Sequence, residues 1–159
     1  MPKRRISLDL WMEALRQAST ELAASSLRFD ATPVPRSKQD PDAQPGAYIA
    51  LLGENVSMHL GLTSSPEGCR MIARGLLGIT RASELTDREV MDGVSEVVNI
   101  IAGKVKSAMV SHDPTLRLGL PMFIVGQVRL TEQMERTVGE VRLGPVDCQL
   151  HVYRNARAA

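Results

Sequence analysis

Aromatic residues are scarce in this chain of 159 residues, where phenylalanine, tryptophan and tyrosine together make up 3%. Neither charge is in excess, since 19 lysines and arginines oppose 18 aspartates and glutamates. Nucleic-acid-binding surfaces combine a basic patch with aromatic platforms, so both shortages argue against a nucleic acid partner. The basic residues at positions 3–5 are too few for a phosphate-binding arm, and we expect residues 1–6 to be a flexible, solvated terminus.

Long uncharged hydrophobic runs are also missing. The most apolar stretch near the start, residues 8–24, contains the charged residues Asp9, Glu13, Arg16 and Glu21. A signal peptide or a membrane-spanning helix requires an uncharged apolar run. The sequence therefore predicts no membrane segment and a cytoplasmic protein.

Cysteine is rare, and the two that occur, Cys69 and Cys148, do not form a C-x-x-C pair. In a reducing compartment we interpret them as small core residues, with a redox or catalytic role as the alternative. The histidines His59, His112 and His151 lie far apart and outside any H-E-x-x-H pattern. We therefore predict no metal site.

The length and the aliphatic content are typical of a single domain, residues 1–159, that buries its own core. Four prolines between positions 33 and 46 predict a mobile loop there. Periodicity predicts helices at 8–25, 66–78 and 86–109, and strands at 27–32, 48–52, 56–62, 122–130, 138–143 and 146–153. This order predicts an α+β fold with a mostly antiparallel sheet and helices packed on it.

The helix at 86–109 is the most informative segment, and Thr86 with Glu89 predicts a capping box at its start. Successive helical residues turn by about 100°, which places Glu96, Asn99 and Gly103 within about 40° of the direction of Asp92. The opposite side of this helix is apolar, with Val94, Val97, Val98, Ile101, Val105 and Ala108. We therefore expect the apolar side to pack on the sheet and the polar row to face solvent, with Lys106 on its flank.

The usual interpretation of such a row is a solvated helix face without a function. Asn99 and Gly103 argue against this interpretation, because asparagine and glycine each lower helix stability by up to about 1 kcal/mol relative to alanine in a helix interior. Gly103 also removes side-chain bulk in the middle of the row. This allows either close approach of another protein's surface or a tight contact within the chain.

The row and its surroundings resemble the CheC/CheX/FliY phosphatases of bacterial chemotaxis. Their signature is Asp or Ser, three residues, Glu, two residues, Asn, and a proline about twenty-two residues later. Here Asp92, Glu96, Asn99 and Pro121 match it, and the run at 99–104 is similar to the family's Asn-x-x-Ala-Gly-Lys. The order of elements matches over roughly residues 8–154, and the single copy of the motif favours CheX, which implies the CheC-like two-layer fold.

The resemblance implies a phosphatase, a hydrolase of two-component signalling that dephosphorylates the aspartyl phosphate of a CheY-like receiver domain. In this family the asparagine positions the attacking water and the glutamate pairs with the receiver's lysine, which implies these roles for Asn99 and Glu96. The Mg²⁺ of the reaction is expected in the partner receiver, with no cofactor held by this chain.

The other motif residues receive supporting roles. Asp92, Gly103 and Lys106 are expected to contact the partner, whereas Pro121 is expected to shape the start of the strand beside the helix. The resemblance also implies a homodimer.

Two further hypotheses stay open. The domain could bind or sequester a receiver without hydrolysing its phosphate, as a module of a chemotaxis or two-component pathway. It could also be a structural oligomer component, with a sheet edge such as the strand at 146–153 pairing between subunits.

Overall fold

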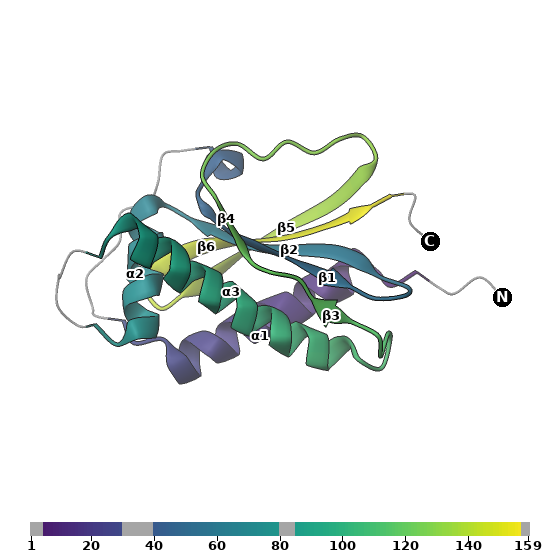
Figure 1. The fold of residues 1–159 in the computed structure, drawn as a ribbon, viewed down its shortest axis with the longest axis horizontal. Helices are drawn as coiled ribbons and strands as arrows, with labels where there is room; N and C mark the ends of the chain where they lie inside the picture. The colour runs from purple at the N-terminus through teal and green to yellow at the C-terminus, as the bar shows by residue number, and fades with distance from the viewer. Residues whose placement is uncertain (1–4, 30–39, 80–84, 157–159) are drawn as a thin grey trace.

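The computed structural model describes residues 5–29, 40–79 and 85–156. This part of the chain forms three α-helices and six strands (Figure 1). In order, they are α1 (Leu8–Ser26), the 3₁₀ helix η1 (Pro41–Ala43), β1 (Gly46–Leu52), β2 (Ser57–Ser64), α2 (Pro66–Leu77), α3 (Asp87–Met109), β3 (Arg117–Leu118), β4 (Met122–Ile124), β5 (Met134–Leu143) and β6 (Val146–Asn155).

The strands form one antiparallel sheet in the order β3-β1-β2-β6-β5, and β4 pairs with the same edge of β1 as β3 does. The α-helices form a second layer, in which α1 contacts β5 and β6 while α3 contacts β1. Figure 1 shows α1 and α3 running side by side across the sheet. The predicted α+β fold with a mostly antiparallel sheet and helices packed on it is confirmed.

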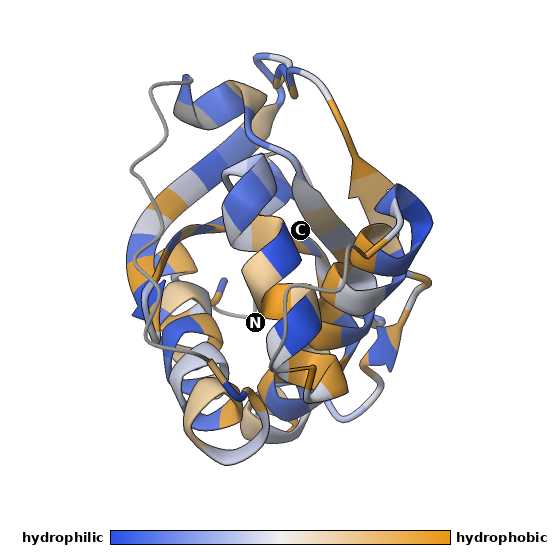
Figure 2. Cartoon of the chain, turned by 90° about the vertical axis from the view of Figure 1, so that its left-hand side faces the viewer, coloured by the Kyte–Doolittle hydropathy of each residue, from blue (hydrophilic) through white to orange (hydrophobic). Residues whose placement is uncertain are grey.

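The core lies between these two layers. Alternate strand residues such as Ile49, Leu60 and Leu150 are buried beneath helix residues such as Trp11 and Leu15. Strand residues alternate between the two faces of a sheet, whereas a helix buries one stripe. Figure 2 shows the corresponding mixture of hydrophobic and hydrophilic residues along the helices. Cys69 and Cys148 are free and buried, as predicted for core residues.

The helices begin where the sequence predicts, because each starts at a capping side chain. The Ser7 hydroxyl accepts from the Asp9 amide, and the Ser65 hydroxyl accepts from the Gly68 amide. Gly78 ends α2 with φ of 68°, a left-handed conformation that glycine adopts at little cost. These local interactions explain why the helix boundaries could be predicted closely.

Strand boundaries were predicted less well. Residues 27–29 belong to no strand, and residues 30–32 of the strand predicted there lie outside the described part of the chain. The segment at 27–29 instead continues from α1, and its Arg28 amide donates to the Gly75 carbonyl of α2. The strand predicted at 122–130 ends at Ile124, because Gly126 has φ of 129° and extended pairing stops there.

The prediction that the strand at 146–153 lies at a sheet edge is wrong. β6 pairs with β2 on one side and with β5 on the other, so its backbone groups are used within the chain. The edges are β5 and, on the far side, β3 with β4. Any pairing between subunits through the sheet would have to use those strands.

Two predicted flexible segments are described in part. Residues 1–4 lie outside the described chain, and Arg5 donates hydrogen bonds to the carbonyls of Asn155 and Ala156. Residues 33–39 of the proline-rich segment also lie outside it, whereas Asp42 forms an ion pair with Arg136 at 3.0 Å. Across the described residues, no helix is both long and apolar enough to span a membrane.

The face of the sheet opposite the helices carries a buried polar cluster. The two ring nitrogens of His151 hydrogen-bond to the hydroxyls of Thr63, at 2.8 Å, and of Tyr153, at 3.0 Å. The ring of Tyr48 lies against the rings of His151 and Tyr153. Gly61 has no side chain, which leaves the space that the Tyr48 ring occupies. Burial is the main cause that lowers the pKa of His151 from 6.5 to about 4, so this imidazole is neutral near pH 7.

Candidate functional site

Helix α3 carries the predicted motif, and its first turn is held firmly. The Thr86 hydroxyl accepts from the Glu89 amide at 3.2 Å, and the Glu89 carboxylate accepts from the Thr86 amide at 3.2 Å. Arg70 of α2 donates to the Leu85 carbonyl and pairs with Asp87, both at 2.9 Å. The predicted capping box is confirmed, and together these bonds fix the direction in which α3 leaves α2.

The inner side of α3 is buried along its whole length. Its buried residues are Val90, Gly93, Val94, Val97, Val98, Ile101, Ala102, Val105 and Met109. At Gly93 the helix approaches α2 so closely that an added Cβ would lie 2.8 Å from the Cβ of Ala73. The tight contact that sequence reasoning considered at Gly103 therefore occurs at Gly93, and α3 cannot rotate without losing this packing.

The opposite side of α3 presents the motif row to solvent. Asp92 and Glu96 are exposed, and Asn99 and Gly103 are partly exposed. A Cβ added to Gly103 would meet no described residue within 4 Å. Among the residues that the structure describes, no close packing contact therefore requires a glycine at position 103. The structure thus places the four residues on one accessible row, as the helical spacing predicts.

Within the described part of the chain, the side chains of Glu96 and Asn99 form no hydrogen bond or ion pair. They stand one turn apart, with a rise of about 4.5 Å along the helix axis. A row on the outside of a helix is convex and cannot enclose a small substrate, whereas it can enter a cleft of another protein. The free amide and carboxylate are therefore suited to bonds with a second molecule.

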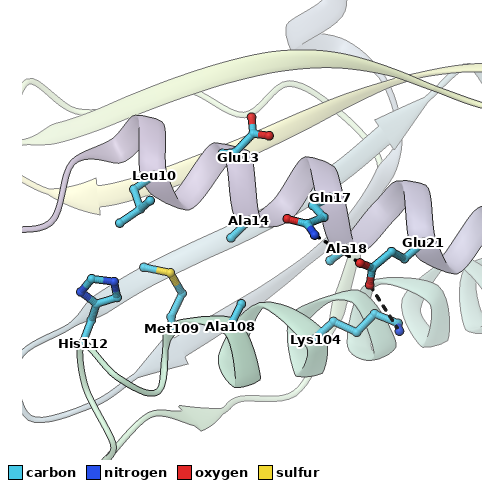
Figure 3. A pocket seen from close by; sticks show the side chains of 10 residues that line it. All are labelled: Leu10, Glu13, Ala14, Gln17, Ala18, Glu21, Lys104, Ala108, Met109 and His112. Carbon is cyan, nitrogen blue, oxygen red and sulfur yellow. Dashed lines mark hydrogen bonds and ion pairs between the residues drawn. The ribbon is translucent and has the colours of Figure 1, made fainter.

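One flank of α3 faces α1 across a shallow groove with a volume of about 260 Å³. Figure 3 shows Leu10, Met109 and His112 at one end of this groove, and Lys104 at the other end paired with Glu21 at 4.0 Å. None of Asp92, Glu96 and Asn99 lines it. The groove therefore lies beside the motif row and is separate from it.

The other flank of α3 contacts β3 and β4 at the edge of the sheet. Pro121 lies directly before β4, between two segments that both pair with β1. Proline has no amide hydrogen, so it is tolerated at an edge strand or at a bulge. Lys106 is partly exposed and lies on this same flank by its position on the helix.

Sequence reasoning missed one residue that supports this edge, Asp113. Its carboxylate is fully buried and accepts from the amides of Asn55, at 3.0 Å, and Thr115, at 2.9 Å. The Thr115 hydroxyl in turn accepts from the Glu54 amide at 2.8 Å. These bonds join the turn between β1 and β2 to the connector that follows α3. The Asp-x-Thr pattern is a local turn signal, but only the fold reveals the contact with the distant turn.

The described residues contain no group of three or more His, Cys, Asp or Glu side chains arranged to hold a metal ion. His151 is enclosed by Thr63 and the tyrosine rings, and the thiols of Cys69 and Cys148 are buried. Burial raises the pKa of Cys69 to about 12, so its thiol is not ionised near pH 7. None of these three side chains is therefore accessible to a second molecule.

Fold and site together define an α+β domain that presents a polar helical row to solvent. The family model described as chemotaxis phosphatase CheX matches residues 45–141, which include α3 and the motif row. The chain belongs to the CheX family. No curated protein matches the sequence significantly.

Solved structures show the same fold. Chemotaxis protein CheX from Desulfovibrio desulfuricans is 14% identical, with a TM-score of 0.68 and coverage of 90% of this chain and 97% of that chain. The CheX–CheY–BeF₃–Mg²⁺ complex from Borrelia burgdorferi gives 17% identity, a TM-score of 0.66, and coverage of 96% and 100%. The FliM middle domain from H. pylori gives 13% identity, a TM-score of 0.57, and coverage of 95% and 88%.

Proposed function

We propose that this protein hydrolyses the aspartyl phosphate of a CheY-like receiver domain. The observation that carries the proposal is the accessible pair Glu96 and Asn99, set one turn apart on α3 in a member of the CheX family. A solved relative of this fold is a CheX in complex with CheY, BeF₃ and Mg²⁺, which supports a receiver as the partner.

The chemistry requires little from the phosphatase beyond positioning. A water attacks phosphorus, the bond between phosphorus and the aspartyl oxygen breaks, and inorganic phosphate leaves a free carboxylate on the receiver. Phosphoryl transfer passes through a loose transition state, so alignment and electrostatics contribute most of the acceleration. The receiver supplies the divalent cation.

Asn99 is suited to aligning the water. Its side-chain oxygen can accept a hydrogen bond from the water while its NH₂ group donates to a phosphoryl oxygen. The amide has no partner among the described residues, so entering the receiver breaks no bond within this chain. A strong base is unnecessary because the acyl phosphate is already activated.

Glu96 is suited to orienting the partner. Its exposed carboxylate can form a charge-assisted bond with the receiver's active-site lysine. Asp92 and Lys106 then act as weaker contacts beside it, and the bare backbone at Gly103 allows the receiver surface to approach α3. Together these residues define the area that the receiver covers.

A non-catalytic receiver-binding module is the second candidate, since the FliM middle domain shares the fold. A turnover measurement distinguishes the phosphatase from the receiver-binding module. Purified protein is added to CheY-like receivers of the same organism, phosphorylated with a small phosphodonor, and the loss of phosphate is followed over time. Faster loss than the receiver's own rate supports the phosphatase, whereas binding without acceleration supports the module.

A further inference from the structure

The outer edge of the sheet changes register where it passes α3. β3 pairs Leu51 with Leu118, and β4 pairs Tyr48 with Met122. From the first pair to the second, the distance along β1 is three residues, and the distance along the outer segment is four residues. The outer edge therefore contains one extra residue, which is a β-bulge.

The position of the bulge follows from one further bond. The Gly119 amide donates to the Ala50 carbonyl at 2.8 Å and so continues the register of β3. Leu120 and Pro121 together then lie opposite Ile49. The motif proline is thus the second residue of this bulge, at an edge where its missing amide hydrogen costs no pairing.

The bulge reverses the alternation of side chains in the residues that follow it. Leu118 and Phe123 both pack against the core, although an odd number of positions separates them. In a regular strand Leu120 would share the core face with Leu118. Instead Leu120 is 88% exposed, the most exposed of the large hydrophobic residues described.

Leu120 belongs to the segment that connects β3 to β4. α3 contacts both β3 and β4, and Figure 1 shows the segment between these strands passing alongside α3. On one flank, α3 contacts α1 through Lys104 and α2 through Gly93. The other flank of α3 therefore faces the sheet edge formed by β3 and β4. By its position on the helix, Asn99 lies toward that flank, so Asn99 and the segment that contains Leu120 belong to the same side of α3.

We propose that Leu120 is an apolar anchor of the receiver-docking surface, an inference that rests on the function proposed above. The row of Asp92, Glu96 and Asn99 offers polar contacts but little apolar area. Stable interfaces have an apolar core that excludes water from the polar contacts around it. The receiver that brings its phosphoaspartate to Asn99 would cover Leu120 in the same approach, because both lie on the side of α3 that faces this edge of the sheet.

The test compares binding with turnover. The affinity of Leu120→Ala for a receiver loaded with beryllofluoride and Mg²⁺ is measured, together with kcat and KM for the phosphorylated receiver. We expect Kd and KM to rise about tenfold. We expect kcat to stay within about twofold, because Asn99 is untouched. Leu120→Met should restore most of the affinity, since it returns the apolar surface.

The matched control is Val138→Ala, which truncates an exposed apolar side chain on β5 at the opposite edge of the sheet. It should leave Kd and KM unchanged. Because Leu120 makes little contact with the core, Leu120→Ala should also keep the wild-type thermal midpoint.

The outcomes separate this inference from the proposed function. If Leu120→Ala binds the loaded receiver as tightly as wild type while Asn99→Ala still slows turnover, the anchor is wrong and the phosphatase stands. If wild type accelerates no dephosphorylation but Leu120→Ala weakens receiver binding tenfold, the anchor stands and the hydrolytic function fails. A change in self-association at unchanged receiver affinity would assign Leu120 to contacts between copies, and would overturn the inference.

Discussion

Gly93 of α3 lies directly against Ala73 of α2, and a Cβ added at Gly93 would be 2.8 Å from the Cβ of Ala73. Ten residues further along the same helix, Gly103 has open space where its Cβ would be. The two glycines therefore serve different purposes. Gly93 allows two helices to pack, and Gly103 keeps an exposed surface bare.

We expect Gly93→Ala and Gly103→Ala to change stability in opposite directions. Gly93→Ala should lower the free energy of unfolding by about 1–3 kcal/mol, because the added methyl group forces α2 and α3 apart. Gly103→Ala should raise it by up to about 1 kcal/mol, since alanine favours the helix and meets no neighbour. Urea denaturation of both variants measures these changes.

Gly103→Ala also tests the docking surface. If the receiver approaches α3 at Gly103, the more stable variant should have a higher KM for the phosphorylated receiver. A Gly103→Ala protein that is stabilised and turns over like wild type would show that Gly103 lies outside the interface.

Asn99→Ala should slow dephosphorylation of the receiver by about 10² or more, by analogy with the loss of one well-placed polar group from an active site. Its thermal midpoint should stay close to that of wild type, because the amide has no partner among the described residues. Single-turnover kinetics at saturating phosphatase isolates this step. Asp92→Asn serves as the comparison and should have a smaller effect, and an unchanged rate in Asn99→Ala would remove Asn99 from the mechanism.

Glu96→Lys should weaken complex formation more than it slows the bound complex, because it replaces an attraction for the receiver's lysine with a repulsion. Titration of a beryllofluoride-loaded receiver measures the affinity. Glu132→Lys makes the same change in net charge at an exposed residue in the connection between β4 and β5 and should bind like wild type. Equal affinities for the two variants would place Glu96 outside the interface.

His151 should make stability depend on pH between 6.5 and 4. Its pKa is lowered from 6.5 to about 4, chiefly by burial and further by Arg136, while Asp42 acts in the opposite direction. In this interval the unfolded chain binds the proton more readily than the folded chain, so acid favours unfolding. Above pH 6.5 the neutral His151 side chain does not lower the free energy of unfolding. As the pH falls from 6.5 toward 4, the free energy of unfolding decreases by about 3 kcal/mol.

Urea denaturation at several pH values measures this effect, with His151→Gln as the variant that removes the titrating group. The glutamine variant should be less stable at pH 7, since it disturbs the bonds to Thr63 and Tyr153. Its stability should nevertheless change less between pH 6.5 and 4.5. A variant with the same slope as wild type would assign the pH dependence to other groups.

The sequence by itself determined the parts of this protein that depend on local interactions. The capping groups at Ser7, Ser65 and Thr86 lie within a few residues of the amides they bind, so the helix starts could be predicted. The helical period likewise determined that Glu96 and Asn99 share an exposed face, because the angle between residues on one helix is independent of the fold.

Only the tertiary structure decided which distant segments meet. The order of the strands placed β6 inside the sheet, where an edge had been predicted, because pairing with β2 and β5 depends on chain segments far from it. The buried Asp113 contact with Asn55 and the close approach of Gly93 to Ala73 have the same origin. The bulge at Leu120 is a difference between two pairing registers, and a register exists only once the strands have paired.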